Sequence, residues 1–227
     1  MISSILRKID QLNKKKIFIQ IGSNDGIIFD NLREFVIKDE WHGIMIEPVR
    51  ETFDELVLNH KKSKNLKFLN VAISDKNENK IISYIPKKAI EENNLNISLK
   101  GCSTFHNNRQ GDESIPMRVF ENKQFLKQEE VKCITIETLI KEQRIDREID
   151  LLQIDTEGHE YKIIKSINFD NLLPRVIIFE TNRRKKMFSN EQIDEMFNIL
   201  IKNNYSIIEC GQDSIAMHSS FLEKIRE

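Results

Sequence analysis

The sequence is poor in the residues and segments that define several classes of protein. Only three of its 227 residues are cysteine, and they are scattered without a CxxC spacing, so complete disulfide pairing is excluded and the reduced thiols of a cytoplasmic chain are expected. No apolar run approaches the roughly 20 residues of a membrane helix, and the N-terminus lacks an apolar signal core, so no membrane span is expected. Glycine and proline are scarce, at seven and four residues, and each should mark a turn or boundary.

Positive charge is not in surplus either. Lysine and arginine total 35 and aspartate and glutamate total 36, so the formal net charge is −1. Because a dedicated nucleic-acid binder usually carries a basic surplus, nucleic acid is not an expected partner. The apolar fraction of 39% is rich in Ile, Leu, Val and Phe, which excludes wholesale disorder. The length fits a single domain over residues 1–227.

Short apolar runs alternate with amphipathic stretches along the chain. An N-terminal helix is expected at about 3–13, and helices are expected after most of the strands. The expected strands are 17–21, 43–47, 66–74, 80–85, 131–134, 149–154, 175–180, 205–209 and 214–218. This order predicts the α/β class, with a Rossmann-like, doubly wound, mostly parallel sheet and a C-terminal antiparallel hairpin. Residues 87–128 show little periodicity and are predicted to form an embellishment loop.

Ligands of such a sheet bind beyond the carboxyl ends of the strands, so the polar residues there form the candidate site. Residues 22–26, Gly-Ser-Asn-Asp-Gly, offer glycines for a tight turn, although Asn24 breaks the GxGxxG pattern. Glu47 ends the second strand 25 residues after Gly22, where a carboxylate can accept from both ribose hydroxyls of a nucleotide. Together these features predict an adenosine-type ligand, and they do not separate a nicotinamide cofactor from S-adenosylmethionine.

A charged cluster follows the strand expected at 149–154. Residues 155–160 read Asp-Thr-Glu-Gly-His-Glu, so four ionisable side chains stand within six residues, which a plain surface turn rarely carries. The next strand ends at Glu180, and four cations follow at 183–186. These cations form either a solvated approach to a helix or an anion-binding lip of a substrate pocket.

The run at 155–160 resembles the Asp-Val-Glu-Gly-His-Glu signature of the FkbM-type methyltransferases, which use S-adenosylmethionine and mostly methylate hydroxyl oxygens of sugars and related natural products. Supporting matches are residues 21–26, 47–48, 71–75, 103–104, 135–139 and 213–218. The resemblance implies a fold of the class I methyltransferase type and an S-adenosylmethionine-dependent O-methyltransferase. The implied acceptor is a small molecule or glycan, and the cations at 183–186 favour a nucleotide-linked or acidic sugar.

The resemblance also implies roles for individual residues. The residues implied to bind the cofactor are Gly22, Ser23, Asn24, Asp25, Gly26, Glu47, Pro48, Ala72, Ile73 and Asp155. The candidates for proton removal are Asp155, Glu157, His159 and Glu180. The residues implied to contact the acceptor are Ser103, Thr104, Asn182, Arg183 and Arg184. A divalent metal on Asp155, Glu180 and Asn182 is an alternative that the signature does not require, so a metal-free base is preferred.

Two other functions stay open at this point. A nicotinamide-dependent oxidoreductase would carry a third glycine in the first turn, where this chain has Asn24 and Asp25. A methyltransferase-like binding domain without activity would tolerate loss of the acidic strand ends, which are intact here. The chain also departs from the family it resembles, with Gln20 where Asp is common and Gln153 where Lys is common. No pattern in the sequence indicates the acceptor hydroxyl or the oligomeric state.

Overall fold

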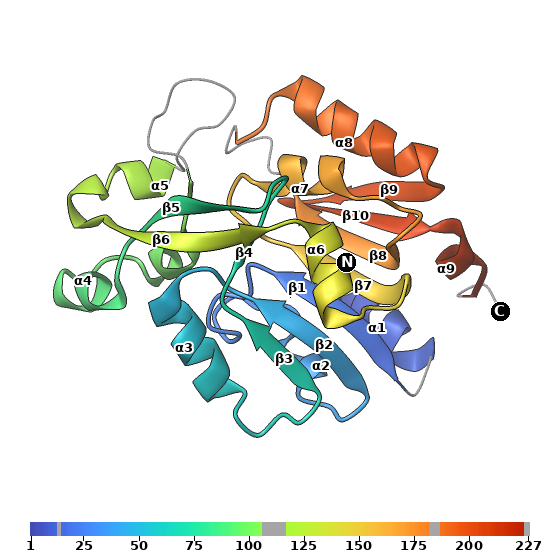
Figure 1. Cartoon of the computed structure of the whole chain (residues 1–227), viewed down its shortest axis with the longest axis horizontal. Helices are drawn as coiled ribbons and strands as arrows, with labels where there is room; N and C mark the ends of the chain where they lie inside the picture. Colours follow the sequence, from blue (N-terminus) through green and yellow to red (C-terminus); the bar gives the residue numbers. More distant parts are fainter. Residues whose placement is uncertain (13–14, 106–116, 182–186, 225–227) are drawn as a thin grey trace.

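A seven-stranded sheet in the order β3-β2-β1-β7-β8-β10-β9 forms the centre of the molecule (Figure 1). The computed structural model describes residues 1–12, 15–105, 117–181 and 187–224. The strands of this sheet are β1 Lys16–Ile21, β2 Trp41–Ile46, β3 Leu66–Leu69, β7 Glu148–Ile154, β8 Leu173–Glu180, β9 Tyr205–Cys210 and β10 Asp213–His218. The first five pair in parallel, and β10 runs antiparallel to both β8 and β9. The predicted α/β fold is confirmed.

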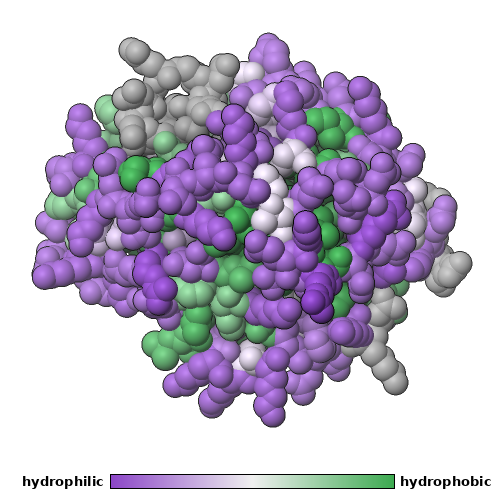
Figure 2. Space-filling view, viewed as in Figure 1, coloured by the Kyte–Doolittle hydropathy of each residue, from purple (hydrophilic) through white to green (hydrophobic). Residues whose placement is uncertain are grey.

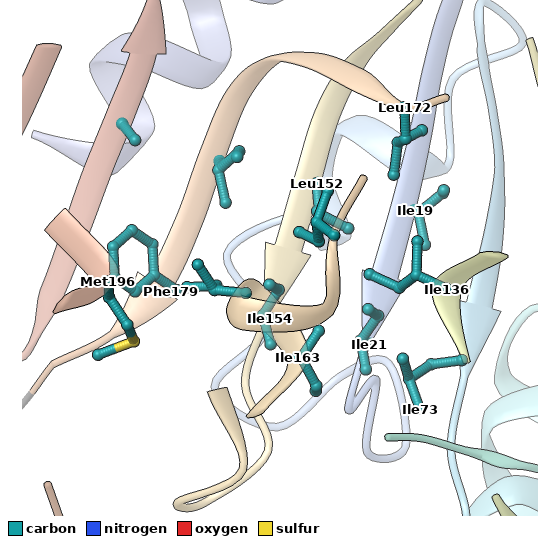
Figure 3. Packing of buried hydrophobic residues seen from close by; sticks show 14 of the residues in the cluster. Ile19, Ile21, Ile73, Ile136, Leu152, Ile154, Ile163, Leu172, Phe179 and Met196 are labelled. Carbon is teal, nitrogen blue, oxygen red and sulfur yellow. The ribbon is translucent and has the colours of Figure 1, made fainter. Parts of the chain in front are cut away.

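Helices cover both faces of this sheet, because successive side chains of a strand point to opposite faces. Helices α6, α7 and α8 pack on one face, and α1, α2, α3 and α9 pack on the other. Figure 3 shows the first face, where Phe179 of β8 lies beside Met196 of α8 and Ile154 of β7 lies beside Ile163 of α7. The helices are α1 Ile2–Leu12, α2 Arg33–Val36, α3 Arg50–Asn59, α6 Ile136–Gln143, α7 Glu160–Ser166, α8 Asn190–Lys202 and α9 Ser219–Lys224.

A second sheet of three strands has the order β4-β6-β5. Its strands are β4 Ala72–Ile73, β5 Glu78–Tyr84 and β6 Lys127–Ile134. The prediction of one strand over 66–74 is wrong, because β3 ends at Leu69 and β4 pairs with β6. The break falls at Asn70, whose side-chain amide donates to the carbonyl oxygens of Glu47 at 2.9 Å and Pro48 at 2.8 Å. These bonds hold the chain at the end of β2 while it passes from one sheet to the other.

The described parts of the segment 87–128 contain more regular structure than the predicted loop. It contains the helices α4 Lys87–Glu92, η1 Ile97–Gly101, α5 Met117–Phe120 and η2 Lys123–Phe125, and β6 already begins at Lys127. Ile85, Ile90 and Leu99 pack into a small apolar cluster of their own. Each helix is too short for a periodic pattern to indicate it, and this local burial stabilises the segment instead.

Hydrophilic side chains cover most of the face seen in Figure 2, with apolar side chains visible in patches between them. Cys102, Cys133 and Cys210 form no disulfide bond with one another in the described ranges. Within the described ranges, every helix is too short or too polar to cross a bilayer.

Candidate active site

A cavity of about 600 Å³ opens at the carboxyl ends of β1, β2, β7 and β8. The sequence-predicted residues that line it are Gly22, Ser23, Asn24, Glu47, Pro48, Ala72, Ile73, Ser103, Thr104, Asp155, Glu157, His159 and Glu180. Parallel strands bring their carboxyl ends to one edge of the sheet, so residues far apart in the sequence meet there. Asp25 and Gly26 do not line this cavity, and Asn182, Arg183 and Arg184 lie outside the described residues.

The turn after β1 brings the backbones of two strands into contact. Gly22 has a φ of +78°, and a Cβ atom added to it would lie 1.7 Å from the carbonyl oxygen of Asp155. The N–H of Asp155 donates to the carbonyl oxygen of Ile21 at 2.9 Å, which fixes the same junction. Only glycine combines a left-handed backbone with this close approach. The first glycine of the predicted turn is therefore required by the end of β7 itself.

Asp25 stabilises this turn through contacts within the protein and does not line the cavity. Its carboxylate accepts from the N–H groups of Ile27 and Ile28 and pairs with Lys100 Nζ at 2.6 Å. Burial raises the pKa of Asp25, but the Lys100 ammonium and the two N–H groups outweigh burial and lower that pKa below its ordinary value. Lys100 also pairs with Glu55 of α3. The sequence analysis assigned Asp25 to the cofactor and did not identify Lys100. In the structure, the ion pair between these two residues attaches η1 to the turn after β1.

Glu47 follows β2 and is only 5% exposed. Its Oε2 accepts from the N–H of Asn24 and its Oε1 from the N–H of Val49, each at 3.0 Å. Burial raises the pKa of Glu47 to about 7 despite these two bonds. A carboxylate offers about four acceptor positions, so Glu47 keeps acceptor capacity toward the cavity that it lines.

The loop between β7 and α7 is held by Glu160, a residue to which the sequence analysis gave no role. Glu160 is fully buried, and its carboxylate accepts from the N–H of Thr156 at 2.6 Å and of Gly158 at 2.9 Å. Burial and the nearby Glu180 raise its pKa to about 7. With the loop closed on Glu160, the side chain of Glu157 lies in the cavity although its own backbone is left-handed, with a φ of +52°.

His159 is placed by Ser74, which directly follows β4, and by Phe105. Its Nε2 lies 3.0 Å from Ser74 Oγ, which in turn donates to Asp75 at 3.0 Å. The ring of Phe105 packs edge-on against the imidazole, with centroids 5.2 Å apart. Ser74 therefore orients the imidazole of His159. No pattern in the sequence indicated this role of Ser74.

Three carboxylates converge at the ends of β7 and β8. Within the described ranges, Asp155, Glu157 and Glu180 each place one oxygen within 4.8 Å of those of the other two. Asp155 is exposed at the surface of the cavity, but desolvation by the surrounding protein and repulsion from Glu157 and Glu180 raise its pKa well above the ordinary value. Such a group can serve as a general base, and an all-oxygen set also suits a divalent cation. Glu157 stands here as the third acidic group, whereas the sequence analysis placed Asn182 in the metal set.

Ser103 and Thr104 enter the cavity from the embellishment segment. Thr104 pairs with Ser83 of β5, with its N–H donating to the Ser83 carbonyl at 2.9 Å and the Ser83 N–H donating back at 2.8 Å. This bridge attaches the predicted acceptor-binding pair to a fixed strand. The segment thereby forms a wall of the cavity opposite the ends of β7 and β8.

The raised pKa values of Glu47 and Glu160 predict a pH-dependent stability. Each group binds its proton more tightly when folded, so its contribution to stability is complete below the unfolded pKa of about 4.5 and is lost as the pH rises through about 7. The free energy of unfolding should fall between about pH 5 and pH 8, by on the order of 3 kcal/mol per group. Urea titrations of the protein and of Glu47→Gln at several pH values measure the free energy of unfolding. This free energy should fall less with pH in the variant than in the unmodified protein, and an equal fall in both would contradict the role of Glu47.

The sheet order, with an antiparallel strand inserted beside β8, and the cavity at the ends of β1, β2 and β7 define the class I methyltransferase fold. A family model described as the methyltransferase FkbM domain matches residues 20–207. The chain therefore belongs to the FkbM methyltransferase family, as its resemblance implied.

One solved structure supports this fold, and a second similarity is weaker. The methyltransferase FkbM from Methylobacillus flagellatus KT superposes with a TM-score of 0.51 at 13% identity, over 90% of this chain and 44% of that one. This chain thus spans less than half the length of that protein. A precorrin-6y C5,15-methyltransferase from Geobacter metallireducens GS-15 gives a TM-score of 0.45 at 10% identity, over 96% and 87% of the two chains. No curated protein matches the sequence.

Proposed function

We propose that the protein is an S-adenosylmethionine-dependent O-methyltransferase that methylates a hydroxyl group of a sugar or glycan-like acceptor. The observation that carries the proposal is the convergence of Glu47, the Gly22 turn and three carboxylates on one cavity. Membership of a methyltransferase family supports the reaction class. The three free thiols support a place in a reducing compartment such as the cytoplasm.

The residues around the cavity fit the cofactor part by part. Glu47 keeps acceptor positions for the ribose hydroxyls, and Ala72 and Ile73 offer apolar surface for the adenine. The backbone of the Gly22 turn lines the cavity and is proposed to receive the methionine part. When bound, S-adenosylmethionine supplies an electrophilic methyl group. A nicotinamide cofactor is the weaker candidate, because Asn24 and Asp25 fill the positions of the glycine-rich turn that its pyrophosphate needs.

The carboxylates supply the proton chemistry. Asp155, whose pKa is raised by desolvation and by its acidic neighbours, is suited to take the proton of the acceptor hydroxyl. A positioned base contributes on the order of 10²- to 10⁴-fold, whereas holding two reactants in contact contributes about 7–11 kcal/mol of the barrier. The walls that orient the acceptor therefore matter more than the base. Ser103, Thr104 and Glu180 give these walls the polar groups that a hydroxyl-rich acceptor requires.

Two further parts of the proposal concern the acceptor and the base, and the acceptor contacts lie outside the described ranges. Arg183 and Arg184 are proposed to face an acidic or nucleotide-linked part of the acceptor. A metal-free base is proposed over a divalent ion, because proton removal by a carboxylate of raised pKa needs no further group.

The substitution Glu47→Ala tests the proposed function. We expect it to weaken S-adenosylmethionine binding by about 10- to 100-fold, because a buried charged acceptor of two hydroxyl groups is lost. Isothermal titration calorimetry measures the affinity, and the exposed Glu40→Ala is the matched control. Unchanged affinity in Glu47→Ala would remove this residue from the site. Binding of NAD in preference to S-adenosylmethionine by the unmodified protein would contradict the proposed function.

A further inference from the structure

Two glutamines lie side by side at the inner end of the cavity. Gln20 of β1 and Gln153 of β7 are partners in the parallel register, and both line the cavity. Gln20 is 2% exposed and Gln153 is 7% exposed. The side-chain oxygens Gln20 Oε1 and Gln153 Oε1 are buried and have no hydrogen-bond partner among the described residues. Buried amide oxygens are rarely left without a donor, so these two indicate a ligand group.

Asp30 completes this cluster from the turn segment between β1 and α2. Its Oδ1 accepts from Gln20 Nε2 at 3.0 Å and from the N–H of Leu32 at 2.9 Å. Its Oδ2 is buried without a hydrogen-bond partner, and no lysine or arginine in the described ranges pairs with this carboxylate. Asp30 also lines the cavity. The cluster therefore presents three acceptor oxygens and one negative charge.

The chemistry of this set selects a particular kind of group. Gln20 Nε2 already donates to Asp30, and the oxygens Gln20 Oε1, Gln153 Oε1 and Asp30 Oδ2 still lack donors. A ligand that satisfies them must donate several hydrogen bonds, and the carboxylate favours a positive charge. A primary ammonium has three N–H donors and one positive charge. A hydroxyl offers one donor and no charge, and a carboxylate would be repelled by Asp30.

We propose that Asp30, Gln20 and Gln153 bind the α-ammonium of the methionine part of the methyl donor, with Asp30 supplying the charge that Gln20 lacks. This inference rests on the proposed function. Gln20 precedes the Gly22 turn by two residues and Gln153 precedes Asp155 by two residues, so the cluster lies roughly 6–7 Å along the strands from the turn that receives the methionine part.

Calorimetry with two ligands tests this subsite. S-adenosylhomocysteine carries the ammonium, whereas 5′-methylthioadenosine keeps the adenosine and the sulfur but lacks the amino-acid tail. Asp30→Asn preserves an oxygen for the Leu32 N–H and removes the charge. We expect this variant to bind S-adenosylhomocysteine about 10- to 100-fold more weakly and 5′-methylthioadenosine within about twofold of the unmodified protein. Gln153→Leu should show the same selective loss, and the exposed Asp39→Asn should show none.

The two ligands distinguish a failure of the proposed subsite from a failure of the proposed function. Retained 5′-methylthioadenosine binding shows that each variant is folded around its adenosine site. Unchanged S-adenosylhomocysteine affinity in Asp30→Asn would overturn the subsite alone and leave an amine of the acceptor as the other source of an ammonium. Tighter binding in that variant would also overturn it, because the tail carboxylate would then lie against Asp30. If neither ligand binds the unmodified protein, the proposed function fails together with the subsite.

Discussion

Replacing Gly22 by alanine should lower the free energy of unfolding by about 2–6 kcal/mol. The added Cβ would meet the Asp155 carbonyl oxygen at 1.7 Å, and the residue would have to keep a φ of +78°. Overpacking costs about 1–3 kcal/mol, and a strained backbone costs about as much again. Since a domain of this kind is stable by about 5–15 kcal/mol, the loss is large. Urea unfolding monitored by circular dichroism measures it.

Gly211→Ala is the matched control for this experiment. Gly211 also has a left-handed backbone, with a φ of +71°, but a Cβ added there would meet nothing within 4 Å. Its substitution should therefore cost only the backbone strain, about 1–2 kcal/mol. Equal losses at the two positions would show that the approach of the β7 end to Gly22 is not a constraint, and would contradict our account of why the turn begins with glycine.

The second large effect is expected from Asp155→Asn. Methyl transfer should fall by about 10²- to 10⁴-fold, because the asparagine amide cannot accept the proton of the acceptor hydroxyl. The rate is followed as S-adenosylhomocysteine released from S-adenosylmethionine with a panel of hydroxylated sugars and nucleotide sugars. The variant should be at least as stable as the unmodified protein at about pH 8, since it removes a carboxylate crowded by Glu157 and Glu180. Undiminished turnover would exclude Asp155 as the base.

A divalent cation at the same carboxylates predicts a different result after chelation. With a metal-free base, the exhaustively chelated enzyme should keep its full rate, and added magnesium or manganese should not raise it. A cation held by Asp155, Glu157 and Glu180 would instead make the chelated enzyme inactive, with activity restored by the ion. Restoration by either ion would reverse our preference for the metal-free reaction.

Much of the fold was readable from local patterns. The strands at 17–21 and 149–154 are mostly apolar because both of their faces are buried. A short run of this kind that ends at glycine or acidic residues indicates such a strand directly. The position of the site follows from a general property of parallel sheets. A parallel sheet delivers the residues that follow its strands to one edge, so Gly22, Glu47 and Asp155 could be assigned to one cavity before any coordinates were known.

Other features depend on partners distant in the sequence. The strand expected at 66–74 is split because Asn70 bonds to the end of β2, a contact that no apolar pattern records. Asp25 was assigned to the cofactor, yet its charge is used by Lys100, 75 residues later.

The sequence by itself therefore determined the order of most strands of the main sheet, the edge of the sheet that forms the cavity and the family. These follow from hydrophobic periodicity and from residues adjacent to strand ends, which are local properties of the chain. Only the tertiary structure decided which polar side chains face the cavity and which are used within the protein. That choice depends on hydrogen bonds across 10 residues between Gln20 and Asp30 and across 85 residues between Ser74 and His159. Their geometry is fixed by the packing of the two sheets, which the sequence pattern does not encode locally.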